Sequence, residues 1–423
     1  MGKTSSPFVF HGRAPLLIAL IVCLASMTAF IGWERNSASE TRALENRSMA
    51  PLPKLSLLRK DAPEFIKAME AYLKDTVGFR LQANAIYRKL RYYVFRDAPL
   101  ANVTVGRDGH TVLNSPNANA PDAFFDSLCL EQGQPTPELM QQVDETMTAA
   151  GDFFKRHGAV CTFAIAPSTL SLYPDKLPLQ VAPRYRKACK AYPKRDHLLA
   201  RLQRQGEGSG HYHVFYPYAL FNAHKYERGF YPKERYHWEG KSAFLFSRHL
   251  TQASGVTDIL KIDDAAVLTK VKDDIAGFFG FSRPVEGYEY HYPDRTIQVE
   301  SVPWLREFSE HGVLTHLTTA NSLTSKTGLM IANSFGIALA PHLARSFQHF
   351  YYLDLNMIRQ LEQAAVFSAV AKRIQADYVF FVFDDVNVTT IPRRLAAFVQ
   401  LEGLDSQQDV TPAKEADSGH PQL

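Results

Sequence analysis

Four short and almost uninterrupted apolar runs most strongly constrain how this chain folds. A strand that is exposed on one face alternates apolar and polar residues, and these runs do not alternate, so we expect strands buried on both faces. Helical patterns precede or separate them, as in residues 136–158, where Met140 and Val143 share one side and Gly158 ends the pattern. The sequence therefore predicts an α/β fold with a doubly wound, mostly parallel sheet. The runs are AVCTFAIAP (159–167), GLMIAN (328–333), HFYYLD (349–354) and DYVFFVF (377–383).

Two further amphipathic helices are predicted ahead of this pattern, in residues 63–75 and 81–95. Their apolar stripes, which include Phe65 and Met69 in the first helix and Ile86, Leu90 and Tyr93 in the second, are expected to face the core. We place one domain over residues 63–400, with a less regular, β-rich segment at 255–327 that reads as an insertion. Residues 401–423 are polar and are expected to be disordered.

The N-terminal segment predicts a membrane anchor. Residues 14–33, APLLIALIVCLASMTAFIGW, carry no charge and have the length of a helix that crosses a bilayer. Lys3 and Arg13 precede this segment, which predicts a cytoplasmic tail at 1–13, a signal anchor at 14–33 and a linker at 34–62 that leads to an exported domain. A cleaved signal peptide is the alternative, and it exports the same domain.

Charge and cysteine content exclude some classes of function. The chain has 47 basic and 43 acidic residues and no long Lys/Arg run, so we expect no nucleic-acid partner. Cys129, Cys161 and Cys189 lack the spacing of metal ligands, although one disulfide is compatible with an exported protein. Cys161 lies within an apolar run and is expected to be a buried core residue.

Ser334 lies where the buried run 328–333 ends and a helical pattern begins. A hydroxyl at the carboxyl edge of a parallel sheet can act as a nucleophile if a base removes its proton, or it can cap the following helix. His237, in FYPKERYHWEG (230–240), is the candidate general base, because its imidazole follows a polar turn and precedes a helix. The two side chains are 97 positions apart, so this prediction requires two loops to meet in space.

Six motifs, in order, resemble those of the AlgX/AlgJ-like polysaccharide O-acetyltransferases, whose domain is similar to the SGNH hydrolase fold. The motifs are ENRSMAPLP (45–53), YLKDTVGFR (72–80), VGRDGHTVLN (105–114), APSTLSLYPDKLP (166–178), YPKERYHWEGKSAF (231–244) and LMIANSF (329–335). The resemblance implies Ser334 as the nucleophile and His237 as the base. It implies no cofactor and no metal. His110 stands where the family usually has tryptophan.

Two departures from the family pattern concern the site. The family's DxHW aspartate falls on Arg235, which cannot accept a hydrogen bond from the imidazole. Glu234, at the DxxH offset of related hydrolases, either orients His237 in its place or is a solvated loop carboxylate. The family's GDSF block is here Ala332-Asn333-Ser334-Phe335. We assign Asn333, Trp238 and Arg235 as candidate oxyanion or substrate-binding residues.

Other polar and aromatic residues are interpreted as structural. Tyr288, Tyr290, His291 and Tyr292 could contact a glycan, but half-buried aromatic residues of a strand account for them better. Asp384 and Asp385 follow a strand and are interpreted as turn or capping residues unless a metal is found.

The resemblance implies a membrane-anchored periplasmic enzyme of the cell inner membrane. It would take acetyl groups from a membrane-bound O-acyltransferase and pass them through Ser334 to an exported polysaccharide. A non-catalytic polysaccharide-binding or scaffold protein is the alternative, supported by Arg235. A lumenal glycosyltransferase, suggested by the anchor and by N-x-[ST] triplets at Asn46, Asn102 and Asn387, ranks last because no DxD motif supports it.

Overall fold

The computed structural model describes residues 49–76, 80–95, 103–113, 137–178, 194–233, 235–256, 266–272, 284–292, 294–300, 303–304, 313–358 and 362–408. The chain divides into two compact units, Met1–Leu100 with Ile275–Arg283, and Ala101–Asp274 with Pro284–Leu423. The two early helices, which the sequence placed in one domain with the sheet, therefore belong to the first unit.

The described part of the first unit consists of three helices, α3 (Leu55–Lys60), α4 (Ala62–Thr76) and α5 (Arg80–Tyr93). Both predicted amphipathic helices are present. Phe65 of α4 is buried, but Ile86 and Leu90 of α5 are exposed. The expectation that the α5 stripe faces the core is therefore wrong, because periodicity identifies an apolar face without identifying what covers it.

The second unit is built on a seven-stranded sheet in the order β4-β3-β11-β9-β10-β8-β7. The first five strands are parallel, and β8 and β7 extend the sheet with antiparallel pairs, so the predicted mostly parallel sheet is confirmed. The strands are β3 (Val160–Ala166), β4 (His213–Phe215), β7 (Ile297–Glu300), β8 (Leu314–Thr319), β9 (Thr324–Ala332), β10 (Phe347–Asp354) and β11 (Tyr378–Asp384).

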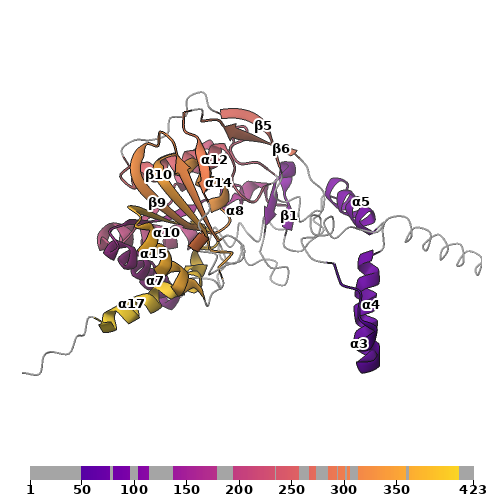
Figure 1. Ribbon diagram of the computed structural model, residues 1–423. Helices are drawn as coiled ribbons and strands as arrows, with labels where there is room; N and C mark the ends of the chain where they lie inside the picture. Colours follow the sequence, from indigo (N-terminus) through magenta and orange to yellow (C-terminus); the bar gives the residue numbers. More distant parts are fainter. Residues whose placement is uncertain are drawn as a thin grey trace, which may run out of the picture. The chain divides into compact units, whose positions relative to one another are not determined.

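Helices cover both faces of this sheet (Figure 1). One face packs against α7 (Pro137–Arg156), α10 (Lys194–Ser209), α15 (Gln363–Ile374) and α17 (Ala396–Gln408). The other face packs against α12 (Lys241–Ala253) and α14 (Gly336–Ala344). Because successive strand residues point to opposite faces, Phe381 stacks on Phe163 in the first layer while Phe380 contacts Phe347 in the second.

Shorter elements complete the second unit. The segment predicted as an insertion supplies β7 and β8 to the main sheet and, with β5 (Ala266–Lys272) and β6 (Pro284–Tyr290), a separate antiparallel pair. Strands β1 (Val103–Val105) and β2 (Thr111–Leu113) form a hairpin around the 3-10 turn η1 (Arg107–Gly109). The remaining helical pieces are α8 (Thr169–Leu172), η3 (Pro174–Lys176), α11 (Tyr218–His224), η6 (Val388–Thr390) and α16 (Ile391–Arg394).

Several sequence expectations concern the ends of the chain and the cysteines. Helix α17 continues to Gln408, into the segment expected to be disordered, because no proline interrupts it. Across the described ranges, no helix is both long and apolar enough for a membrane span, and the predicted anchor at 14–33 lies outside those ranges. Cys161 is a buried free thiol, as predicted. Cys129 and Cys189 also lie outside the described residues, so a disulfide stays a prediction.

Candidate active site

The nucleophile candidate Ser334 lies in the tight turn between β9 and α14. Asn333 shapes this turn, because its Oδ1 accepts a hydrogen bond from the Phe335 N–H at 3.0 Å. Gly336 allows the close return of the chain, since a Cβ at that position would lie 2.6 Å from the Cβ of Ala332. The N-cap residue of α14 is Phe335, and the hydroxyl of Ser334 lies against His237 Nε2 at 2.8 Å, so the structure gives no support to the interpretation of Ser334 as the helix cap.

The structure brings the predicted base to the predicted nucleophile. His237 Nε2 lies 2.8 Å from Ser334 Oγ, although the residues are 97 positions apart. Both residues are only partly buried. With Nε2 unprotonated, the serine O–H donates to it, which is the arrangement needed for general-base activation of a hydroxyl.

Trp238 joins the two loops directly. Its Nε1 donates to the Phe335 carbonyl at 2.8 Å, so the residue after His237 is bonded to the residue after Ser334. The indole is fully buried, and its ring centroid lies 5.5 Å from that of Phe335. This arrangement gives Trp238 no surface for a substrate. The binding role expected for it has no support in the structure, and its contribution is to hold the loops together.

Asn333 is also turned away from solvent. It is buried, and its Nδ2 donates to Asp384 Oδ1 at 2.9 Å. The amide is therefore bonded to the protein interior, a position that does not suit the oxyanion role expected for it.

Asp384 also binds the loop that carries the base. Its Oδ2 accepts from the Tyr236 hydroxyl at 2.6 Å, and its Oδ1 accepts from Asn387 Nδ2 at 2.6 Å. Burial, reinforced by the Asp384 carboxylate, holds the pKa of Tyr236 well above its ordinary value, so the phenol keeps its proton and remains a donor.

Arg235 replaces the family's aspartate without facing the site as an isolated charge. Its guanidinium is largely buried and pairs with the carboxylate of Glu239, four positions later in the sequence, at 2.7 Å. The pair places a negative charge beside the positive one. Glu234, the residue expected to orient the imidazole, lies outside the described residues, so that role stays a prediction.

Sequence reasoning missed Tyr236 and underestimated Asp384. A strand-end aspartate reads as a turn residue, and Asp384 does bind Asn387 three positions later, but its contact with Tyr236 spans 148 positions. Asp385, its neighbour, instead accepts from the Ser168 N–H at 3.2 Å and the Tyr216 hydroxyl at 3.0 Å. The signal available in the sequence was the position of two acidic residues at the carboxyl edge of a buried strand.

The aromatic residues of 288–292 contribute to packing, as the pattern predicted. Tyr290 stacks on Phe244 of α12 with centroids 4.5 Å apart, and the Tyr292 hydroxyl lies 2.8 Å from Nδ1 of His342 in α14. Elsewhere in the described chain, no group of three or more His, Cys, Asp or Glu residues is arranged to hold a metal ion.

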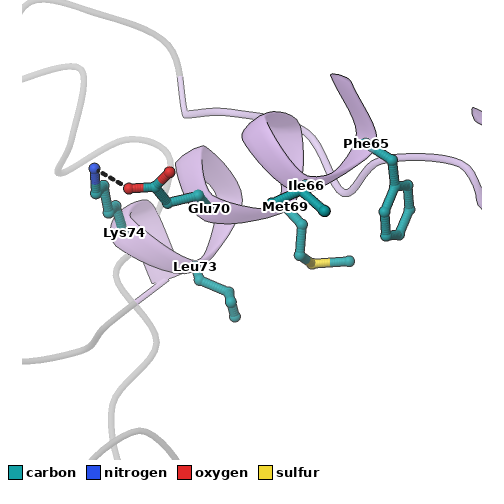
Figure 2. Close-up of a pocket in the computed structure, with 6 residues that line it drawn as sticks. All are labelled: Phe65, Ile66, Met69, Glu70, Leu73 and Lys74. Carbon is teal, nitrogen blue, oxygen red and sulfur yellow. Dashed lines mark ion pairs between the residues drawn. The ribbon is translucent and has the colours of Figure 1, made fainter. Parts of the chain in front are cut away.

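A pocket of 430 Å³ lies along α4 in the first unit. Figure 2 shows apolar side chains projecting from this helix, next to an ion pair of 2.6 Å between Glu70 and Lys74. The lining contains no hydroxyl, thiol or imidazole group, and its two charged side chains pair with each other, so we place the candidate chemistry at Ser334. The lining residues are Phe65, Ile66, Met69, Glu70, Leu73 and Lys74.

Comparisons with known proteins give matches only among solved structures. No protein-family model matches the chain, and no curated protein sequence matches it. Bacillus cereus PatB1, in a structure with a sulfonyl adduct, is 17% identical over 62% of this chain and 95% of its own, with a TM-score of 0.45. The O-acetyltransferase domain of Pseudomonas putida AlgJ is 15% identical over 71% of this chain and 99% of its own, with a TM-score of 0.44.

A third solved structure, Pseudomonas aeruginosa AlgX, is 12% identical over 72% of this chain and 70% of its own, with a TM-score of 0.39. AlgJ and AlgX give their names to the family whose motifs the sequence resembles. Because the TM-scores are below 0.5 and the identities below 25%, these likenesses carry no argument about function, and we argue function from the chain's own site residues.

Proposed function

We propose that this AlgX/AlgJ-like chain is an O-acetyltransferase that modifies a polysaccharide through an acetyl-serine intermediate. The observation that carries the proposal is the 2.8 Å contact between His237 Nε2 and Ser334 Oγ at the carboxyl edge of a mostly parallel sheet. A scaffold protein would not need a hydroxyl in hydrogen-bond contact with an imidazole at that edge, so this contact favours catalysis over the non-catalytic alternative.

The proposed reaction has two halves. In the first, Ser334 Oγ attacks the acetyl carbonyl carbon of the donor while its proton moves to His237 Nε2. The donor's leaving group takes that proton and departs, leaving acetyl-Ser334. In the second half, a sugar hydroxyl attacks the acetyl-serine and gives its proton to His237, and Ser334 departs and recovers a proton from the imidazolium.

The transient negative charge on the carbonyl oxygen needs nearby donors. The backbone N–H of Ser334, in the turn that leads into α14, is a candidate donor for this oxyanion. Asn333 is already bonded to Asp384 and Phe335, and Trp238 to the Phe335 carbonyl, so their polar atoms serve the geometry of the turn.

The setting of the enzyme forms part of the proposal. The apolar segment 14–33 would anchor the chain in the cell inner membrane with the catalytic unit in the periplasm, and a membrane-bound O-acyltransferase would supply the acetyl group. The glycosyltransferase alternative loses part of its motivation, because the amide of Asn387 is partly buried and bonded to Asp384.

Hydrolysis of an activated acetyl ester, p-nitrophenyl acetate, by the full-length protein in detergent tests the proposal. We expect Ser334→Ala to reduce turnover to the uncatalysed rate and His237→Ala to reduce it by about 10²–10⁴-fold, the usual contribution of a general base. A sulfonyl fluoride should modify Ser334 in the wild type, as detected by peptide mass spectrometry.

Ser322→Ala is the matched control. Ser322 precedes β9, at the opposite end of the strand from Ser334, and its hydroxyl donates to the Thr324 carbonyl at 2.9 Å. This variant should retain wild-type turnover. Equal turnover by the wild type and Ser334→Ala would reject the acyl-enzyme proposal, and glycan binding that is indifferent to Ser334→Ala would then support the scaffold alternative.

A further inference from the structure

We propose that Asp384 is a positioning residue that holds the nucleophile turn and the base loop together, and that Asn333 is an amide because it must donate a hydrogen bond to Asp384. The inference rests on the proposed function for its catalytic consequence. The contacts themselves come from buried residues of β11, of the turn after β9 and of the loop before α12.

One carboxylate binds the residue that precedes each reacting group. Tyr236, before His237, donates to Asp384 Oδ2, and Asn333, before Ser334, donates to Asp384 Oδ1. On the other side of the reacting pair, Trp238 donates to the Phe335 carbonyl. The residues before Ser334 and His237 are therefore joined through Asp384, and the residues after them are joined directly to each other. Because Asp384 is fully buried, water does not substitute for a lost partner without rearrangement.

The polarity of these contacts determines which side chain fits at position 333. A carboxylate only accepts hydrogen bonds, so each atom that faces Asp384 must donate. Asn333 donates through Nδ2 to Asp384 and accepts through Oδ1 from the Phe335 N–H. An aspartate at position 333 would keep the second bond but would bring two carboxylates to about 2.9 Å, where both cannot remain ionised without strong repulsion. The change from GDSF to Ala332-Asn333-Ser334-Phe335 thus has a physical reason.

Exchanging Asn333 and Asp384 should restore the hydrogen bond between these two positions, with donor and acceptor reversed. In the double variant Asn333→Asp/Asp384→Asn, the new amide would donate to the carboxylate at position 333 and accept from the Tyr236 hydroxyl. Asn387 would rotate its amide to present its oxygen. The single variant Asn333→Asp has no such solution while both carboxyl groups are ionised.

The experiment is a double-mutant cycle measured by p-nitrophenyl acetate turnover. Asn333→Asp should lose at least about tenfold in kcat/KM at pH 7.5, because a displacement of about 1 Å in a reacting group can reduce the rate by about 100-fold. The double variant should recover to within about threefold of Asp384→Asn alone. Tyr236→Phe, which removes a single donor, should lower kcat with little change in KM.

The pH profile separates positioning from a general loss of structure. Arg394 acts electrostatically on Asp384, and Tyr231 and Asp385 act on Tyr236, and these groups are the same in every variant of the cycle. As the pH falls, one of the two carboxyl groups in Asn333→Asp takes up a proton and becomes a donor, so the rate of this variant relative to wild type should rise. The rate of the double variant relative to wild type should be nearly independent of pH. The proposal would be overturned if the losses in kcat/KM of the two single variants added in the double variant and if the rate of Asn333→Asp relative to wild type did not change with pH.

Asp385→Asn is the matched control, because it makes the same change in the adjacent carboxylate, which binds Ser168 and Tyr216 instead. It should not rescue Asn333→Asp, and rescue by it would also overturn the proposal. If the wild type itself shows no ester turnover, the proposed function fails. The pairing of 333 with 384 is then judged from the same cycle in urea unfolding, where additivity rejects it and recovery by the double variant supports it.

Discussion

Gly240 should be essential for the loop that carries His237, and its replacement by alanine tests how that loop is built. Gly240 is the N-cap residue of α12 and has φ +44 and ψ −104, a conformation that L side chains rarely adopt. A Cβ there would lie 1.9 Å from the carbonyl oxygen and 2.8 Å from the carbonyl carbon of Tyr288. These are backbone atoms of β6, so rotation of a side chain cannot relieve the overlap.

Two contributions add in Gly240→Ala. A residue other than glycine held in a sparsely populated region at positive φ costs about 1–3 kcal/mol, and overpacking against fixed atoms typically costs about 1–3 kcal/mol. The free energy of unfolding should therefore fall by about 2–6 kcal/mol. Gly255, just beyond the other end of α12, provides the matched control, because it has φ +82 and a Cβ there would have no atom within 4 Å. In Gly255→Ala the free energy of unfolding should fall only by the conformational contribution, about 1–3 kcal/mol.

Urea unfolding of both variants, followed by circular dichroism, measures the difference. Gly240→Ala should unfold at clearly lower urea than Gly255→Ala, and only Gly240→Ala should also lower p-nitrophenyl acetate turnover, because relief of the overlap displaces Trp238 and His237. Equal unfolding free energies for the two variants would refute the close approach of Gly240 to Tyr288.

Two further predictions concern buried groups of the second unit. Burial lowers the pKa of His110 to about 4, so as the pH falls from about 6.5 toward 4 the unfolded chain takes up the proton first and the folded state loses stability. Over this pH range, urea unfolding should show a smaller loss of stability for His110→Phe than for the wild type, and an equal loss would contradict the burial of His110. Burial also raises the pKa of the Cys161 thiol, so iodoacetamide at pH 8 should modify Cys161 only in the urea-unfolded protein. Peptide mass spectrometry measures this modification, and a modified Cys161 in the native protein would show that the thiol is accessible.

The parallel part of the fold could be predicted because its strands are buried on both faces. The four apolar runs became β3, β9, β10 and β11, the four central strands of the sheet. The edge formed by β8 and β7 could not be predicted, because short strands such as Ile297–Glu300 expose much of their surface and carry little apolar signal. The division into two units was also missed, since the stripe of α5 resembles that of a core helix.

The meeting of Ser334 and His237 could be predicted, but the groups that hold them could not. Each reacting residue carries a local signal, a polar side chain at the end of a strand or before a helix. The supporting contacts have no local signal, because Trp238 binds a carbonyl oxygen that any residue would supply at position 335. Asp384 reaches Tyr236 only after β11 has paired with β9 in the folded sheet.

The two motif departures therefore do not by themselves indicate loss of catalysis. Arg235 would oppose the formation of an imidazolium at His237 if it were an isolated charge, but the Glu239 carboxylate 2.7 Å away offsets it. Asn333 would be a defect if the turn needed an acidic side chain, but the carboxylate facing it is supplied by Asp384. In both cases, whether a residue suits its position depends on the charge or hydrogen-bonding polarity of its partner. A motif comparison that scores each position separately would count two losses where the structure shows two matched pairs.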